Sequence, residues 1–259
     1  MSDTKGSMQL LYSVRDLVKK FANGFEGARG ISLDIYEGEC LLIAGPNGSG
    51  KTIFMRMLAG LMEPSGGEIL FRGEPLSYWK AKKNNVPSIG LVFQDADAQL
   101  IGETVEEDIR FGPENLKLDK NEIESRVNDV MEKLDLTGKK DFSPKRLSGG
   151  EKRRLAVAGV LAMGSATVIM DEPFANLDWP GVQQVLKLLS ELKAMGKTII
   201  ILTHELEKVL AFADRLVILD KGKVMDEGNP EEVLDRMDAS WGIRDPRHTY
   251  KSARDCTWL

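Results

Sequence analysis

A glycine-rich loop that directly follows a short apolar run constrains the fold of this chain more than any other feature. The run 41–44 reads Leu-Leu-Ile-Ala, residues 45–52 read Gly-Pro-Asn-Gly-Ser-Gly-Lys-Thr, and a helix-like stretch continues to Ala59. The loop fits the phosphate-loop pattern, in which glycine and four residues precede Gly-Lys-Ser/Thr. Glycines let successive backbone N–H groups approach phosphate oxygens, and the following helix points the positive end of its dipole at the anion. A ligand-free turn would not need this order between a buried strand and a helix start. The residues predicted to bind nucleotide in the loop are Gly45, Pro46, Asn47, Gly48, Ser49, Gly50, Lys51 and Thr52.

Two adjacent carboxylates end a second buried-strand run at 167–170. In a phosphate-loop enzyme, a carboxylate at this strand end holds the Mg²⁺ hydration shell, and the hydroxyl of the loop ligates the ion. Asp171 and Thr52 are therefore predicted at a Mg²⁺ site, with Lys51 on the β- and γ-phosphates of the nucleotide. Glu172 is predicted to be the general base that accepts a proton from the attacking water.

Short β-rich runs alternate with helical stretches, which is typical of an α/β protein with a largely parallel sheet. Further buried strands are expected at 198–202 and 215–219, and residues 181–195 have the periodicity of a crossover helix. The runs 67–71 and 89–93 are expected in a smaller antiparallel layer. Residues 104–163 look like a helical insertion with breaks at Gly112-Pro113, Gly138 and Ser143-Pro144. The predicted fold class is a phosphate-loop NTPase core with an N-terminal antiparallel β layer and an inserted helical subdomain. The predicted divisions are the β layer and first part of the core (1–93), the helical subdomain (94–163), the second part of the core (164–230), and a C-terminal helix and tail (231–259).

The composition excludes several classes of protein. The 259 residues are 42% apolar and 29% charged with a net charge of −5, as expected for a soluble globular chain. Because affinity for nucleic acid depends on a basic surface, the acidic excess argues against that function. The longest apolar run, 155–163, is too short to cross a bilayer. Cys40 and Cys256 lie in no Cys/His cluster with zinc spacing, which fits a reducing cytosol.

Residues 147–151, Leu-Ser-Gly-Gly-Glu, resemble the signature of ABC-type ATPases and begin upstream of Asp171 in the order of that family. The resemblance covers about residues 9–235. It implies that Gln94 is the glutamine that contacts the metal and takes part in catalysis, and that His204 is a catalytic switch at the γ-phosphate. Outside this family a histidine after a buried strand would as readily be structural, and His248 is assigned no role. The resemblance also implies that Phe21 stacks on adenine and that 175–178 form the D-loop.

The signature also has a physical interpretation. Ser148, Gly149 and Gly150 open a helix, so they offer free N–H groups and a hydroxyl for a second grip on the γ-phosphate. In the family this signature reaches the nucleotide of a partner subunit. The resemblance therefore implies a head-to-tail homodimer, or a heterodimer with a related ATPase, with ATP between the chains. Three residues depart from the pattern of the family. Glu151 stands where glutamine is commoner, Ile53 where many members have a hydroxyl residue, and Asn176 where the D-loop usually has a small residue.

A single cassette without a long coiled-coil insertion favours transport over DNA repair or translation. Segments 94–100, 104–109, 111–115 and 154–163 are similar to the ATPases of energy-coupling factor importers, including cobalt and nickel systems. This resemblance implies a motor subunit at the cytoplasmic face of the membrane. It would power uptake of a vitamin or transition metal ion through separate integral membrane subunits, without touching the cargo. The alternative is a soluble ATPase switch that acts on a protein or RNA partner.

Two segments have open interpretations. Six acidic residues and no basic one lie between residues 95 and 108. They form either a solvated face or a dock for an arginine-bearing coupling helix of a membrane subunit. The tail 239–259, with Trp241 and Trp258, either extends the dimer contact or is a flexible end.

Overall fold

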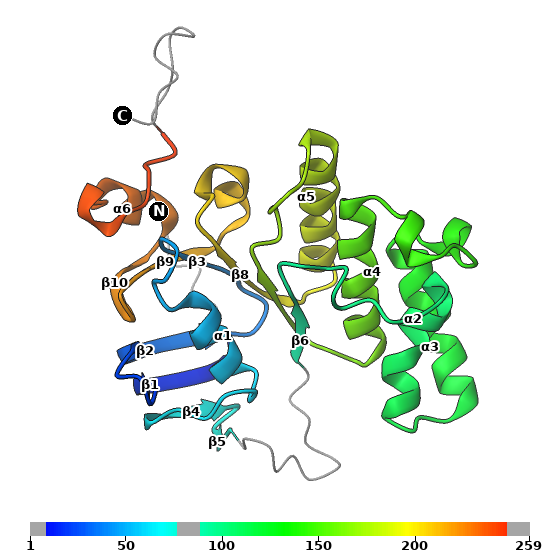
Figure 1. Ribbon diagram of the computed structural model, residues 1–259, viewed down its shortest axis with the longest axis horizontal. Helices are drawn as coiled ribbons and strands as arrows, with labels where there is room; N and C mark the ends of the chain where they lie inside the picture. The colour runs from blue at the N-terminus through cyan, green and yellow to red at the C-terminus, as the bar shows by residue number, and fades with distance from the viewer. Residues whose placement is uncertain (1–8, 77–88, 248–259) are drawn as a thin grey trace, which may run out of the picture.

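The computed structural model describes residues 9–76 and 89–247, in which the larger of two sheets has one hydrophobic cluster on each face (Figure 1). The larger sheet has the order β10-β9-β3-β8-β7-β6, and all its strands are parallel except β10. The smaller sheet is antiparallel, with the order β2-β1-β4-β5. The strands of the larger sheet are β3 Cys40–Ala44, β6 Ile89–Val92, β7 Thr167–Asp171, β8 Thr198–Thr203, β9 Arg215–Asp220 and β10 Lys223–Gly228. Those of the smaller sheet are β1 Leu10–Lys20, β2 Glu26–Tyr36, β4 Gly66–Phe71 and β5 Glu74–Pro75.

The parallel sheet is covered on both faces, which is why β3, β7 and β8 are buried at every position and carry unbroken apolar runs. Successive side chains of a strand point to opposite faces. In β3, Leu41 and Ile43 belong to the core on the side of α1 (Lys51–Leu58) and the antiparallel sheet. The alternate residues Cys40, Leu42 and Ala44 belong to the core on the side of α4 and α5.

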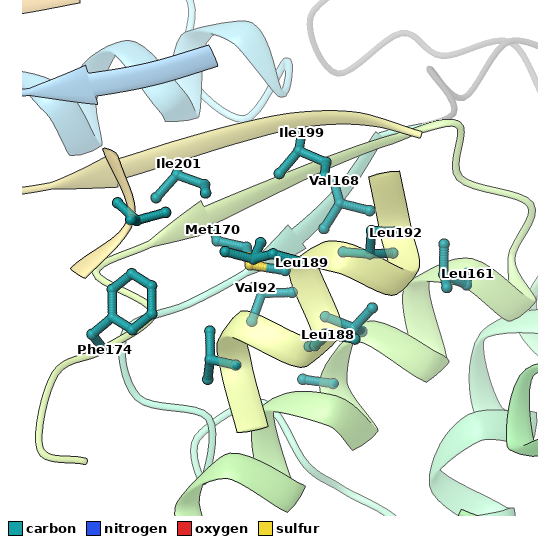
Figure 2. Packing of buried hydrophobic residues seen from close by; sticks show 14 of the residues in the cluster. Val92, Leu161, Val168, Met170, Phe174, Leu188, Leu189, Leu192, Ile199 and Ile201 are labelled. Carbon is teal, nitrogen blue, oxygen red and sulfur yellow. The ribbon is translucent and has the colours of Figure 1, made fainter. Parts of the chain in front are cut away.

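Helices α4 (Gly149–Ala162) and α5 (Trp179–Ala194) cover that second face. Figure 2 shows Leu189 of α5 beside Met170 of the sheet and Leu192 of α5 beside Val168. The predicted crossover helix at 181–195 is therefore confirmed. Its buried face includes Leu188, whereas Leu186 is only partly buried.

The predicted helical insertion consists of α2 (Val105–Asn115), α3 (Lys120–Lys133) and α4, with short 3₁₀ turns at Thr137–Lys139 and Pro144–Arg146. The expected break at Gly112-Pro113 is wrong, because α2 continues through Pro113. The helix ends two residues later, so the proline removes only one hydrogen bond near a terminus. Pro113 itself is buried.

The run 89–93 does not join the antiparallel layer. Its first four residues form β6, the edge strand of the parallel sheet, and Val92 pairs with Met170 of β7. This pairing joins segments far apart in the chain, so local composition could not reveal it. The run 67–71, by contrast, lies in β4 beside β1 and confirms the antiparallel layer.

The C-terminal part packs on the core as far as the structure describes it. After the 3₁₀ turns Leu206–Lys208 and Leu210–Phe212, the chain forms β9, β10, α6 (Pro230–Asp235) and a 3₁₀ turn at Ala239–Trp241. Ile243 is only 7% exposed within the core. A Cβ atom added to Gly242 would lie 3.2 Å from Cγ of Pro46, so the tail contacts the phosphate loop. Residues 239–247 are therefore not a loose end, while His248, Cys256 and Trp258 lie outside the described residues.

Within the described residues, no helix combines the length and hydropathy of a membrane span.

Candidate active site

The phosphate loop joins β3 to α1. It is packed so tightly that two of its glycines leave no room for a larger residue. A Cβ atom at Gly45 would lie 2.2 Å from the carbonyl oxygen of Leu219. Gly50 has φ +105°, and its Cβ would lie 2.4 Å from the carbonyl oxygen of Gly27. Backbone oxygens cannot move aside as side chains do, so the neighbouring strands dictate glycine at both positions.

Lys51, the first residue of α1, is 6% exposed and turns its ammonium back over the loop. Nζ donates to the carbonyl oxygens of Gly45 at 2.7 Å and Pro46 at 3.2 Å. It also lies 3.7 Å from Oε1 of Glu172. Burial lowers the pKa of Lys51, and the negative charge of Glu172 opposes that shift. The ammonium is held where it can meet phosphate oxygens that enter the loop.

Glu172 directly follows β7 and has φ +46°, a left-handed conformation that costs a non-glycine residue about 1 kcal/mol or more. The backbone is held there because Glu172 N–H donates to the carbonyl oxygen of Leu202 at 2.8 Å. The carboxylate accepts a hydrogen bond from Thr203 Oγ1 at 2.9 Å, and Oε1 lies 2.9 Å from His204 Nδ1. The strained residue thus aims its 7% exposed carboxylate between Lys51 and His204.

Asp171, the last residue of β7, accepts a hydrogen bond on Oδ2 from Thr52 Oγ1 at 2.9 Å. Its Oδ1 atom is buried and accepts no hydrogen bond from the described residues. Burial raises the pKa of Asp171, because the charged form is poorly solvated. An unsatisfied carboxylate oxygen beside a hydroxyl is the oxygen-only donor set that Mg²⁺ prefers, so these residues fit the predicted ion. Among the described residues, no group of three or more His, Cys, Asp or Glu is placed to hold a metal ion, at this site or at any other.

Parallel strand pairing brings five of the predicted residues to one edge of the sheet. β3 and β7 both pair with β8, and the carboxyl ends of parallel strands meet at the same edge, where ligands bind in such folds. The residues gathered there are Lys51, Thr52, Asp171, Glu172 and His204.

Gln94 and Phe21 make no contact with this group among the described contacts. Gln94 is exposed two residues after β6, and the described contacts place its side chain against neither Thr52 nor Asp171. Its backbone oxygen accepts a hydrogen bond from Arg153 at 3.2 Å. Phe21 follows β1, and its ring would lie 3.3 Å from a Cβ atom on Gly27, whose carbonyl oxygen faces Gly50. The aromatic ring therefore stands beside the entrance of the loop.

The signature lies across the sheet from the phosphate loop. Ser148 caps α4 by accepting from Glu151 N–H at 3.3 Å, and Glu151 accepts in return from Ser148 N–H at 2.8 Å. Either glutamate or glutamine can complete such a capping box, and the carboxylate of Glu151 also forms an ion pair with Lys139. Because α1 and α4 cover opposite faces, Ser148, Gly149 and Gly150 make no contact with the loop in the described residues.

The D-loop departure also has a local reason. Asn176 has φ +59°, and asparagine tolerates this left-handed conformation better than most residues. Asp178 caps α5 by accepting from Gly181 N–H at 2.9 Å.

Two polar residues that contact the candidate active site or its loops were not predicted from the sequence. Thr203 ends β8 and orients Glu172 by donating a hydrogen bond to its carboxylate. Its position at the end of a buried strand was the sequence signal that could have predicted this role. Arg153 lies in α4 beside Lys152 and Arg154, and it donates to the carbonyl oxygens of Ala175 and Gln94.

The family model described as ABC transporter matches residues 28–175. The chain is also 39% identical over 225 residues to the energy-coupling factor transporter ATP-binding protein EcfA of Methanocaldococcus jannaschii, covering 86% of this chain and 81% of that protein. The chain belongs to the ABC transporter family.

A second relative and a solved structure are similar to this chain over most of its length. EcfA of Methanococcus maripaludis is 40% identical over 225 residues, which cover 86% of this chain and 81% of that protein. The structure of cbiO1 from Clostridium perfringens, described as part of the ABC transporter complex cbiONQ, has a TM-score of 0.80 and 37% identity over 88% of this chain and 91% of that one. The predicted fold class, the predicted ATPase and the predicted resemblance to energy-coupling factor ATPases are thereby confirmed.

Proposed function

We propose that this chain is the ATP-hydrolysing motor subunit of an energy-coupling factor importer at the cytoplasmic face of the membrane. It would power uptake of a vitamin or transition metal ion through separate membrane subunits. The observation that supports this most directly is the single edge where Lys51, Thr52, Asp171, Glu172 and His204 meet. The similarity to EcfA and cbiO1 supports the transport role.

The loop residues would bind the triphosphate of ATP through their N–H groups, with Lys51 on the β- and γ-phosphates. Phe21 would stack on adenine beside the loop. Thr52 and Asp171, with Gln94 moving in from the end of β6, would hold Mg²⁺. When bound, this ion neutralises charge that develops on the phosphate oxygens.

Hydrolysis would depend on the carboxylate of Glu172. It accepts the proton from the attacking water as the water oxygen bonds to the γ-phosphorus and the bond to the β-phosphate oxygen breaks. Thr203 Oγ1 and His204 Nδ1 fix the carboxylate in orientation. His204 is 47% exposed, so its other ring nitrogen is free to contact the γ-phosphate.

Ser148, Gly149 and Gly150 would grip the ATP of a partner subunit, either an identical copy or a related ATPase. They lie on the face of the sheet opposite α1, so one chain does not place both binding elements on one nucleotide. A helix start with a serine at its cap suits a phosphate that approaches from outside.

The membrane subunits would dock on an apolar groove between α2 and α4. The groove has a volume of about 270 Å³, and Phe111 and Met163 are among its lining residues. Ile101 and Phe111 are 57% and 50% exposed there, an unusual density of large apolar side chains at a surface. The groove suits an apolar helix face.

The acidic residues of segment 95–108 are mostly bound by other groups of the same chain. Asp108 accepts from the N–H groups of Ile101 at 2.7 Å and Gly102 at 2.8 Å. Asp97 pairs with Lys152 at 2.6 Å, and Glu106 pairs with Arg110 at 2.9 Å. We therefore propose that apolar contact supplies most of the docking energy, while exposed carboxylates such as Asp95 favour an arginine on the incoming helix.

Purification of the tagged chain from detergent-solubilised membranes tests this proposal. The wild type is expected to co-elute with hydrophobic membrane subunits and to release phosphate from ATP. Phe111→Glu should abolish co-elution, and Asp95→Lys with Asp97→Lys should weaken it. Met225→Glu changes an exposed side chain of β10 away from the groove and is the matched control. An active chain that always purifies without membrane subunits would instead favour a soluble ATPase switch.

A further inference from the structure

Arg153 is a buried cation in the second turn of α4, just after the signature. Its side chain reaches two loops that are distant in sequence. Nη2 donates to the carbonyl oxygen of Ala175 at 2.9 Å and to that of Gln94 at 3.2 Å. One nitrogen therefore joins the loop after β6, the loop after β7 and the helix that the signature opens.

This charge is costly where it lies. Arg153 is 5% exposed, and its Nε atom is buried and donates to no acceptor in the described part of the chain. Within that part, no carboxylate lies within ion-pair distance of it. Burial lowers the pKa of Arg153, and the more distant negative charge of Asp95 opposes that shift. The neighbouring Arg154 shows the common structural solution, because it pairs with Glu191 at 2.7 Å.

The two carbonyl groups belong to the loops that carry catalytic side chains. Gln94 is itself a predicted metal contact. Ala175 N–H donates to the carbonyl oxygen of Glu172 at 3.1 Å, so Ala175 is bound into the turn that contains the proposed base. A polar pocket of about 370 Å³ separates these segments, and Arg153 is one of its lining residues. The guanidinium of Arg153 contacts both loops, whereas the ion pair of Lys152 with Asp97 ties only the Gln94 loop to α4.

We propose that Arg153 is a positioning residue that ties the Gln94 loop and the Ala175 loop to the signature helix. A shift of α4 would then move both loops together. Residues of α4 such as Ala156 and Val160 also line the apolar groove. The link would therefore carry movement between the docking groove and the catalytic edge, a role that rests on the proposed function. Arg153 touches no reacting atom.

Amide hydrogen exchange of the full chain without nucleotide tests the link itself. Arg153→Met should speed exchange about tenfold in peptides covering 93–99 and 172–178, the factor for one lost charge-assisted hydrogen bond. Protected amides exist in both loops, since Gln99 N–H donates to Ala96 and Ala175 N–H to Glu172. Exchange in β8 should stay unchanged. Unchanged exchange in either loop would overturn the proposal.

Arg126→Met is the matched control, since Arg126 also donates from its guanidinium to a carbonyl oxygen of α4, that of Ala162 at 3.2 Å. It should leave both loops unaffected. Arg153→Lys keeps a positive charge on a shorter side chain. Its amide exchange rates in the two loops should fall between those of the wild type and those of Arg153→Met. If Arg153→Met does not fold, Arg153→Lys is compared with the wild type instead. Wild-type exchange rates in both loops of Arg153→Lys would then reject the link.

Steady-state kinetics separates positioning from folding. Arg153→Met should lower kcat on the order of tenfold with KM for ATP within about twofold, because the phosphate loop is untouched. Partial rescue by Arg153→Lys is expected. An unchanged kcat, or a loss of activity fully explained by less folded protein, would reject the role. If the wild type hydrolyses no ATP, the proposed function fails, while the exchange experiment still decides whether the link exists.

Discussion

Replacing Glu172 by glutamine should stop turnover while leaving the binding of ATP intact. The amide keeps the shape of the side chain and can keep the hydrogen bond from Thr203 Oγ1, which is 2.9 Å long in the wild type. It cannot accept the proton of the attacking water. General-base catalysis contributes about 10²- to 10⁴-fold, so even the lower limit raises the barrier by about 3 kcal/mol.

The same change should not weaken ATP binding. The carboxylate lies 3.7 Å from Lys51 Nζ, and at an effective dielectric constant of about 20 this pair attracts by roughly 4 kcal/mol. That attraction competes with phosphate for the ammonium. Without it, Lys51 is free to move onto the triphosphate, and repulsion between the carboxylate and the γ-phosphate disappears.

Phosphate release and nucleotide retention measure the two effects separately. Glu172→Gln should release phosphate at most about one hundredth as fast as the wild type. It should retain ATP and form the closed pair of subunits in light scattering. Glu207→Gln, which changes an exposed carboxylate beyond His204, should behave as the wild type. Wild-type turnover by the Glu172→Gln variant would refute the assignment of the base.

Three other features of the structure carry predictions. Ser148→Arg should abolish hydrolysis but leave ATP binding to the chain's own loop unchanged in a filter assay; normal hydrolysis would exclude the cross-subunit site. Asp171 has a raised pKa, so its contribution to stability is present below the unfolded value near 3.8 and is lost as pH rises through the folded value. Asp171→Asn should therefore raise the melting temperature at pH 7 in chelator, with a difference that shrinks toward pH 4; an equal or lower melting temperature at pH 7 would contradict this. Gly50→Ala should cost about 2 kcal/mol or more in urea denaturation because its Cβ meets a backbone oxygen at 2.4 Å, whereas Gly138→Ala, with open space around it, should not.

The local sequence was sufficient to predict the elements whose structure depends on neighbouring residues in the chain. The phosphate loop needs its glycines and lysine in a fixed order, and the buried strands of a doubly covered sheet need unbroken apolar runs. The strands are confirmed, and the loop lies between β3 and α1 as its order requires. The break predicted at Pro113 was wrong because a proline near the end of a helix removes only one hydrogen bond, and α2 continues to Asn115.

The sequence by itself determined which chemical groups this protein has and roughly where each element begins. Strand order was decided only by the tertiary structure, which placed β6 beside β7 and not in the antiparallel layer. The same is true of the strained backbone of Glu172, the unsatisfied oxygen of Asp171 and the double contact of Arg153. Each of these depends on atoms brought together from distant parts of the chain. Burial, desolvation and close contact are properties of that packing and have no counterpart in a local pattern.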